Sequence, residues 1–213
     1  MGLTDFVWIA SYPRSGNTYL RTILRHAFGL RSTSIYLDDL GGNKELEDYV
    51  GHIEPHSNWQ DLLKETNISL VKTHRHADDN TPAIYVIRDG RAACVSLWEF
   101  YHRKYPIQVF IEGRCFCGVW VDHVKSWNPW ERPNTLLLRY EQLRDDLPTA
   151  IHTISDFLKI DIKTTSIPDR NALAGVDGRW VKKRTSWRAK LTGENLRRFV
   201  EINQDILEKA GYL

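Results

Sequence analysis

The chain has 213 residues, of which 42% are hydrophobic and 26% are charged. This composition excludes wholesale disorder, and the length predicts one compact domain over residues 1–213. Lys and Arg number 29 against 27 Asp and Glu, so the net charge of +2 argues against a general nucleic-acid coat but permits a local basic site.

Strands and helices are predicted to alternate along the chain, from the spacing of apolar residues and the positions of Gly and Pro. In chain order, we expect a strand at 6–11, a helix at 17–30, loops around one short helix at 31–67, strands at 68–73 and 83–87, helices at 91–101 and 116–127, a strand at 135–139, a helix at 141–158, a loop at 161–184 and a helix at 192–210. This order is typical of α/β proteins, in which helices cover both faces of a mostly parallel sheet.

Cysteine content and apolar runs bear on the compartment of the protein. Three cysteines are too few for a disulfide framework. No secretory leader opens the chain, and no apolar run approaches the roughly 20 residues that span a bilayer. We therefore expect a cytoplasmic protein that does not bind membranes.

The loop from Tyr12 to Thr18 is predicted to bind an anion such as phosphate or sulfate. It joins a strand to the start of a helix, where backbone N–H groups and the helix dipole attract negative charge. Gly16 lets the backbone come close, Arg14 adds a cation, and Ser15 adds a hydroxyl group. A plain turn with a surface arginine is the alternative that the local pattern leaves open.

The same loop differs from the phosphate loop of nucleotide triphosphatases. That motif requires a glycine, four residues, and then Gly-Lys-Ser/Thr. Here Ser11 holds the first glycine position and Asn17 holds the position of the lysine. A nucleotide or small-molecule kinase is therefore a disfavoured alternative.

The loop resembles the 5′-phosphosulfate-binding loop of the sulfotransferases that depend on 3′-phosphoadenosine 5′-phosphosulfate (PAPS), usually Pro-Lys-Ser-Gly-Thr-Thr-Trp. Other blocks of that family are matched in the same order over nearly the whole chain. They are Lys72-Thr73-His74, Arg88 with Ser96, Arg139 to Leu143, Trp187-Arg188, Leu191-Thr192 and Gly211-Tyr212. The resemblance implies a three-layer, P-loop-like α/β fold. It also implies transfer of a sulfuryl group from PAPS to an acceptor hydroxyl or amine, which leaves 3′,5′-bisphosphoadenosine (PAP) and requires no metal ion.

The resemblance further implies which residues hold the nucleotide. They are Arg14, Ser15, Gly16, Asn17, Thr18, Tyr19, Arg88, Ser96, Tyr140, Lys183 and Arg184. Within this set the loop residues are expected at the 5′-phosphate, Arg88 with Ser96 at the 3′-phosphate, and the two tyrosines at the adenine. An ion pair of Arg88 with Asp89 is an open alternative, and so is a Tyr140 packed under the edge of the sheet.

For catalysis the resemblance implies His74 as the general base, with Lys72 and Arg14 stabilising negative charge. A histidine that is neutral at working pH can accept a proton from the attacking acceptor. Lys72 lies two residues earlier on the same face of an extended segment. His76 shares that face and is the rival candidate for the base.

The C-terminal part departs from the family pattern. The family block Arg-Lys-Gly-x-x-Gly-Asp-Trp is degenerate here, because Thr185 and Ser186 precede Trp187 and the glycines are missing. Lys183 and Arg184, which follow Lys182, supply only charge. A non-catalytic nucleotide-binding module therefore remains an alternative, and nucleic-acid binding through residues 182–190 is a further, weaker one.

Cys115 and Cys117, with His102 and His123 nearby in sequence, form a poor zinc pattern, because structural zinc sites usually space cysteines by two to four residues. We expect buried thiols and no metal. The expected acceptor is a small molecule, a glycan or a peptide, with no nucleic-acid or membrane partner, and residues 31–67 and 98–130 are expected to shape its pocket.

Overall fold

The computed structural model of the chain describes residues 6–56, 58–65, 69–168, 172, 175–178 and 186–213. At its centre is a five-stranded sheet with the strand order β2-β3-β1-β4-β5. Every pair of neighbouring strands in it is parallel, which confirms the predicted sheet. The strands are β1 (Val7–Ser11), β2 (Thr33–Ser34), β3 (Leu70–Thr73), β4 (Ala83–Ile87) and β5 (Thr135–Arg139).

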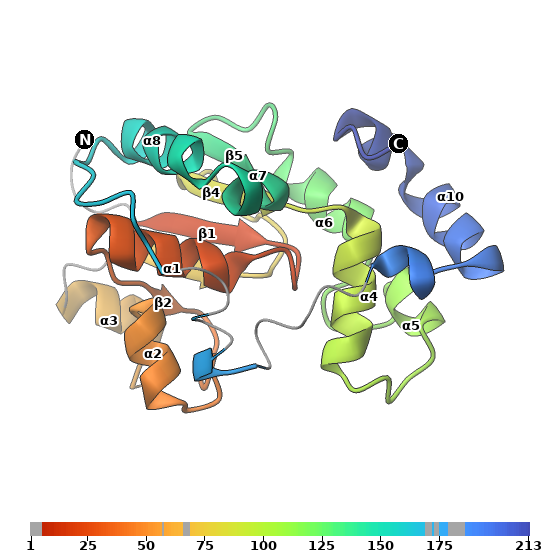
Figure 1. The fold of residues 1–213 in the computed structure, drawn as a ribbon, viewed down its shortest axis with the longest axis horizontal. Coiled ribbons are helices and arrows are strands. Elements are labelled where there is room, and N and C mark those ends of the chain that lie inside the picture. The colour runs from red at the N-terminus through yellow and green to blue at the C-terminus, as the bar shows by residue number, and fades with distance from the viewer. Residues whose placement is uncertain (1–5, 57, 66–68, 169–171, 173–174, 179–185) are drawn as a thin grey trace.

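Helices cover both faces of the sheet, as Figure 1 shows. They are α1 (Asn17–Phe28), α2 (Lys44–Val50), α3 (Trp59–Glu65), α4 (Gly90–Phe100), α5 (Gln108–Ile111), α6 (Trp120–Trp127), α7 (Tyr140–Asp145), α8 (Leu147–Leu158), the 3₁₀ helix η1 (Trp187–Ala189) and α10 (Gly193–Lys209). Alternate strand residues face opposite layers. Ile9 and Ile84 belong to the core under α1 and α8, whereas their neighbours Ala10 and Tyr85 belong to the core under α4, α6 and α10.

Residues 31–67 contain more regular structure than the one short helix expected. The structure has β2, α2 and α3 in this segment. The side chain of Asn43 accepts a hydrogen bond from the Leu46 N–H at 3.2 Å and thereby caps α2. Leu46 and Val50 bury against Leu40 in a small separate core. Such short elements carry too few apolar residues for a helical period to stand out.

Two predicted helices have different bounds in the structure. The helix expected at 141–158 is divided into α7 and α8 at Asp146, whose side chain accepts from the Thr149 N–H, and Pro148 lies in the first turn of α8. The helix expected at 116–127 begins only at Trp120, because residues 115–118 form a turn closed by a hydrogen bond from the Gly118 N–H to the Cys115 carbonyl. The four-residue α5 was not expected.

The parallel sheet brings the carboxyl ends of its strands to one edge. Ser11 of β1 lies beside Val86 of β4, and Ile87 lies beside Arg139 of β5. The loops that follow β1, β3, β4 and β5 therefore start from the same edge, and a family-like motif lies at the end of each of these four strands.

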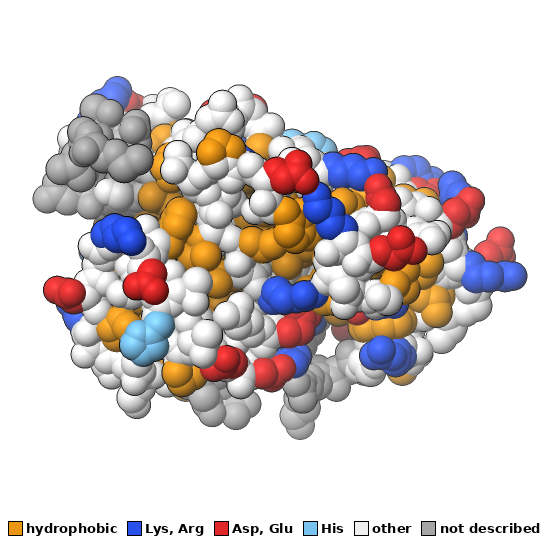
Figure 2. Space-filling view, turned by 90° about the horizontal axis from the view of Figure 1, so that it is seen from above, with side chains coloured by type: hydrophobic (Ala, Val, Ile, Leu, Met, Phe, Trp, Pro, Cys, Tyr) orange, Lys and Arg blue, Asp and Glu red, His pale blue; other side chains and the backbone are white. Residues whose placement is uncertain are grey.

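Charge is mixed on the molecular surface. On the face in Figure 2, Lys and Arg side chains lie among Asp and Glu side chains around exposed apolar groups. Within the described ranges, every helix is too short or too polar to cross a membrane.

Candidate functional site

The loop between β1 and α1 has an unusual backbone at two positions. Arg14 has a φ of 66° and Gly16 a φ of 107°, both in the left-handed region. A Cβ atom at position 16 would lie 2.5 Å from Cδ2 of Tyr140. The loop therefore requires glycine here, both for its backbone conformation and for the close approach of the tyrosine ring.

The predicted cations meet at this loop in what we call the arginine cluster: Arg14, Arg88 and Ser96. Nε of Arg14 lies 3.3 Å from Oγ of Ser96, and Nη1 of Arg88 donates to the carbonyl of Arg14 at 2.7 Å. The guanidinium of Arg88 also lies 4.6 Å from the centre of the Tyr140 ring. Residues that follow β1, β4 and β5 thus converge with Ser96 of α4 at the edge of the sheet.

The arginine cluster concentrates positive charge. Burial, together with the repulsion of Arg88, lowers the pKa of Arg14 to about 10, so both arginines are charged at neutral pH. Asp89 instead pairs with Arg91, whose Nε lies 2.9 Å from its carboxylate. The buried hydroxyl of Ser15 has no hydrogen-bond partner among the described residues. An orphaned donor next to two cations fits an anionic group such as phosphate.

The remaining loop residues have structural contacts of their own. The side-chain amide of Asn17 donates to the Ile9 carbonyl at 2.9 Å and to Ser11 Oγ at 3.3 Å, which ties α1 to β1. Thr18 is partly exposed at the start of α1. Tyr19 and Tyr140 are largely buried in the core, with 8% and 5% of their surface exposed.

His74 lies just beyond the end of β3 in a defined orientation. Its Nδ1 is 2.7 Å from the Ser11 carbonyl, which can only accept, so the proton of the neutral ring lies on Nδ1 and the lone pair lies on Nε2. The backbone N–H of His74 donates to Oη of Tyr36 at 3.0 Å. Burial and the charge of Lys72 lower the pKa of His74 to about 3, so this imidazole is neutral at working pH.

Lys72 belongs to a second charged group, which we call the lysine cluster: Lys72, Asp39 and Arg21. The Lys72 ammonium forms an ion pair with one carboxylate oxygen of Asp39, and Nη1 of Arg21 lies 2.7 Å from the other. All three side chains are buried. The two cations hold the pKa of Asp39 far below its ordinary value against the opposing effect of burial, so its carboxylate is ionised.

The sequence analysis did not single out Asp39 or Arg21. Arg21 offered a signal, because it lies four residues after Asn17 and three before Leu24, on the face of α1 that packs inward. A buried arginine needs an acidic partner. Asp38 and Asp39 follow β2 and were available, although spacing alone does not say which of the two turns inward.

The other sequence candidates have various positions. His76 is exposed, and its ring lies at right angles to that of the buried His123, with the ring centres 5.5 Å apart. Lys182, Lys183 and Arg184 lie outside the described residues. No cluster of three or more His, Cys, Asp or Glu side chains in the described part of the chain has the arrangement of a metal site.

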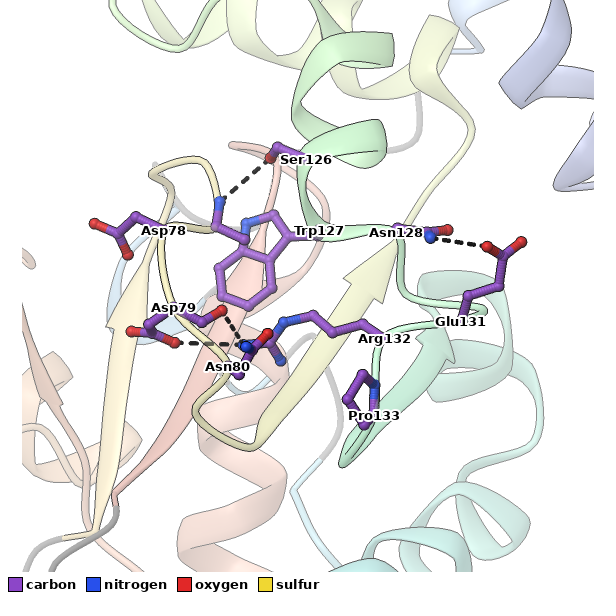
Figure 3. A pocket seen from close by; sticks show the side chains of 10 residues that line it. Asp78, Asp79, Asn80, Ser126, Trp127, Asn128, Glu131, Arg132 and Pro133 are labelled. Atoms are coloured by element: carbon purple, nitrogen blue, oxygen red, sulfur yellow. Dashed lines mark hydrogen bonds and ion pairs between the residues drawn. The ribbon is translucent and has the colours of Figure 1, made fainter.

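None of the residues that line a further hollow belongs to these clusters. This groove of about 510 Å³ lies between the β3–β4 connection and the end of α6 (Figure 3). Arg132 crosses it, with Nη2 donating to the carbonyls of Asp79 at 3.0 Å and Thr81 at 2.7 Å. Its guanidinium also lies 4.9 Å from the centre of the Trp127 ring. These contacts give the groove a structural role in joining two loops.

Comparisons with known proteins identify the family of the chain. The sulfotransferase domain family matches residues 4–173. Sulfotransferase 1E1 of Rattus norvegicus is 26% identical over 184 residues, which are 74% of this chain and 60% of the rat protein. Luciferin sulfotransferase of Photinus pyralis is 24% identical over 197 residues, with 75% of this chain and 52% of that protein covered. The chain thus spans about three-fifths or less of these relatives.

Solved structures show the same fold. Mouse sulfotransferase SULT7A1 complexed with PAP matches with a TM-score of 0.68 at 21% identity, over 95% of this chain and 84% of the mouse chain. Retinol dehydratase in a complex with retinol and PAP matches with a TM-score of 0.63, also at 21% identity, over 94% and 80% of the two chains.

Proposed function

We propose that this chain, which belongs to the sulfotransferase family, transfers a sulfuryl group from PAPS to an acceptor hydroxyl or amine. The main support for this proposal is that the arginine cluster and the residues after β3 lie at the same edge of the sheet. Arg14 lies 3.3 Å from Ser96, and His74 is 2.7 Å from the last residue of the strand that leads into the loop of Arg14. Anion-binding groups and a candidate base thus share one edge of the sheet.

The two ends of the nucleotide have separate partners in this proposal. The backbone N–H groups at the start of α1 and the hydroxyl of Ser15 bind the 5′-phosphate. Arg88 and Ser96 bind the 3′-phosphate. Tyr140 supports both regions, because its ring packs against Gly16 and under the guanidinium of Arg88. We further propose, from the family resemblance, that Tyr19 and Tyr140 contact the adenine. The same resemblance places Lys183 and Arg184 at the 3′-phosphate in this proposal.

His74 acts as the general base. Its Nε2 accepts the proton of the acceptor group while the acceptor atom bonds to sulfur and the bond from sulfur to the phosphate oxygen breaks. Arg14 and Lys72 stabilise the charge that develops on the leaving phosphate and on the sulfuryl oxygens. The low pKa of His74 makes it a weak base, so we expect its proton uptake to accompany, rather than precede, the attack on sulfur.

A kinase is the less favoured function. The kinase loop needs a lysine that reaches the phosphates, and Asn17 holds that position. The Asn17 amide is used to hold β1 and α1 together through Ile9 and Ser11. ATP-dependent transfer is therefore not the reaction that we propose.

The acceptor that we propose is a small molecule with a nucleophilic hydroxyl or amine. The names of relatives support this class, since they include an amine sulfotransferase and a luciferin sulfotransferase. We place the reaction in the cytoplasm, in keeping with three cysteines that are all free thiols.

The test compares His74→Ala with His76→Ala in the full chain. We expect His74→Ala to lower turnover of a PAPS-dependent acceptor by about 100- to 10,000-fold while its affinity for PAP, measured by calorimetry, stays unchanged. The His76→Ala control removes the rival histidine of the same segment and should retain turnover.

Product is detected by mass spectrometry as a sulfated acceptor from a panel of phenols, alcohols and amines. A chain that binds PAP but sulfates no member of the panel would favour the binding-module alternative. Loss of turnover in His76→Ala alone would transfer the role of base from His74 to His76.

A further inference from the structure

Cys115 and Cys117 face each other across a tight turn. Their Sγ atoms lie 3.2 Å apart, closer than two unbonded sulfur atoms usually come without a hydrogen bond between them. The turn is closed by the Gly118 N–H, which donates to the Cys115 carbonyl at 3.1 Å. The backbone therefore already holds the two thiols side by side, so that little movement would be needed to join them.

The two thiols differ in reactivity. Cys115 is partly exposed, whereas Cys117 is 4% exposed. The hydrogen bond with Cys117 lowers the pKa of Cys115 to about 6, while the same bond and burial raise the pKa of Cys117. Cys115 is thus a thiolate at neutral pH that an oxidant can reach, and Cys117 is a protected thiol beside it.

The pair of cysteines also contacts Tyr12, at the start of the loop between β1 and α1. Sγ of Cys117 lies 3.4 Å from Oη of Tyr12, and the Tyr12 hydroxyl donates to the Gly118 carbonyl at 3.2 Å. Tyr12 is 1% exposed, and its carbonyl accepts from the Ser15 N–H at 3.2 Å within the loop. A change at Cys117 therefore reaches the anion-binding loop through one buried ring.

We propose that Cys115 and Cys117 form a reversible redox site, in which a hydroperoxide converts the two thiols into a disulfide and thereby weakens nucleotide binding by the adjoining loop. The oxidation itself is independent of the proposed function, whereas its effect on the nucleotide rests on that function.

The chemistry balances in two steps. The Cys115 thiolate attacks one oxygen of hydrogen peroxide, and the O–O bond breaks. Cys115 becomes a sulfenic acid, and the released hydroxide takes up a proton to form water. The sulfur of Cys117 then displaces the hydroxyl group from the sulfenic acid, and the Cys117 proton leaves with it as a second water. Two thiols lose two electrons and two protons in total, and one hydrogen peroxide is reduced to two waters. Joining the sulfur atoms shortens their 3.2 Å separation to the roughly 2 Å of a disulfide, which shifts Sγ of Cys117 relative to Oη of Tyr12.

The first experiment measures the intact mass of the full chain after treatment with hydrogen peroxide. We expect a loss of about 2 Da, reversed by dithiothreitol, because disulfide formation removes two hydrogens. Cys115→Ser and Cys117→Ser should each abolish this loss. Cys94→Ala is the matched control, since Cys94 is a buried free thiol in α4, and it should still lose the two hydrogens.

Three outcomes would overturn the redox pair. They are an unchanged mass, a gain of oxygen atoms without any loss of hydrogen in the wild-type chain, and a dimer linked between chains on a non-reducing gel. Each would mean that the two neighbouring sulfurs do not bond to each other under oxidation.

The second experiment compares the affinity of the reduced and oxidised chains for PAP by calorimetry. We expect oxidation to weaken binding by about two- to tenfold, the size of one lost hydrogen bond, and dithiothreitol to restore it. Cys115→Ser should show the same affinity before and after peroxide. Equal affinities of the two wild-type forms would overturn the coupling to the loop. Failure of the reduced chain to bind PAP at all would count against the proposed function, while the mass experiment would still decide on the disulfide.

Discussion

The arginine cluster and the lysine cluster lie at the same edge of the sheet, yet they handle positive charge in opposite ways. Arg14 is set against another cation, and the repulsion of Arg88 helps to lower its pKa to about 10. Lys72 is matched by the Asp39 carboxylate, which Arg21 binds from its other side. The first arrangement sets two cations against each other, whereas in the second two cations share one carboxylate.

The difference indicates a division of labour. A cluster of like charges gains free energy when a phosphate binds, so it is suited to capture a nucleotide. A buried ion triad fixes the position of its members and is costly to break. We therefore expect changes in the arginine cluster to alter affinity and changes in the lysine cluster to alter stability and turnover.

The largest effect is expected for Asp39→Asn, which would leave the Arg21 and Lys72 cations buried without a carboxylate. Removing one partner of a buried ion pair typically costs about 3–5 kcal/mol of unfolding free energy. Urea unfolding measures this loss, and Glu131→Gln, which changes exposed contacts with Lys209 and Asn128, should leave the midpoint nearly unchanged. If Asp39→Asn proved as stable as the wild type, the lysine cluster would not be the rigid unit described here.

Arg88→Met should lower PAP affinity more than stability, the reverse of what we expect for Asp39→Asn. We expect PAP affinity to fall by about 10- to 100-fold, because a charge-assisted hydrogen bond to phosphate is lost, with a smaller loss of stability than in Asp39→Asn. Calorimetry measures the affinity. Arg132→Met is the matched control, because Arg132 also lies over an aromatic ring but at the groove of Figure 3. Equal weakening by both variants would show a general loss of fold instead of a phosphate contact.

Ser96→Ala, also in the arginine cluster, should lower PAP affinity by less than Arg88→Met. The hydroxyl of Ser96 contacts Nε of Arg14 at 3.3 Å and would leave one partner unsatisfied when removed. We expect PAP affinity to fall by about two- to tenfold. Ser126→Ala, whose hydroxyl contacts the Ala77 N–H at the groove, should bind PAP like the wild type. Unchanged affinity in Ser96→Ala would remove this serine from the nucleotide site.

The smallest effect on turnover is expected from pH. With its pKa lowered to about 3, His74 stays neutral from pH 8 to pH 5, so turnover should show no acid decline that is due to this residue. Stability behaves differently. The unfolded chain carries a histidine of ordinary pKa near 6.5 and takes up the proton first. The contribution of His74 to stability is therefore full above about pH 6.5 and is lost as pH falls toward 3. A rate profile with an acid pKa near 6.5 that disappears in His74→Ala would contradict the expectation for turnover.

The sequence predicted the parts of the fold that have strong periodicity. The strands at 83–87 and 135–139 have the predicted bounds, and α1 and α10 differ from the predicted helices by one or two residues at an end. β4 is buried along its whole length, and α1 and α10 carry buried apolar side chains over several turns. The break at Asp146 within the helix expected at 141–158 was missed, because the apolar spacing continues across this residue. The side chain of Asp146 caps a new helix there.

For the candidate site, motif order was more informative than spacing. Arg14, Arg88 and Ser96 are far apart in the sequence, and their resemblance to one family predicted that they meet at one edge, which they do. Asp39 was missed because its role depends on a long-range pairing with Lys72, which no local pattern reveals. Spacing disfavoured a zinc site at Cys115 and Cys117, but it did not indicate that their Sγ atoms lie only 3.2 Å apart.

The ring of Tyr140 joins three distant segments, since it fills the space beside Gly16 and carries the Arg88 guanidinium on its face. It is also the first residue of α7. An anion that settles into the loop would therefore hold the start of α7 in place through this ring. Amide hydrogen exchange along residues 140–145 should slow when the nucleotide binds, which would make this short helix a reporter of occupancy.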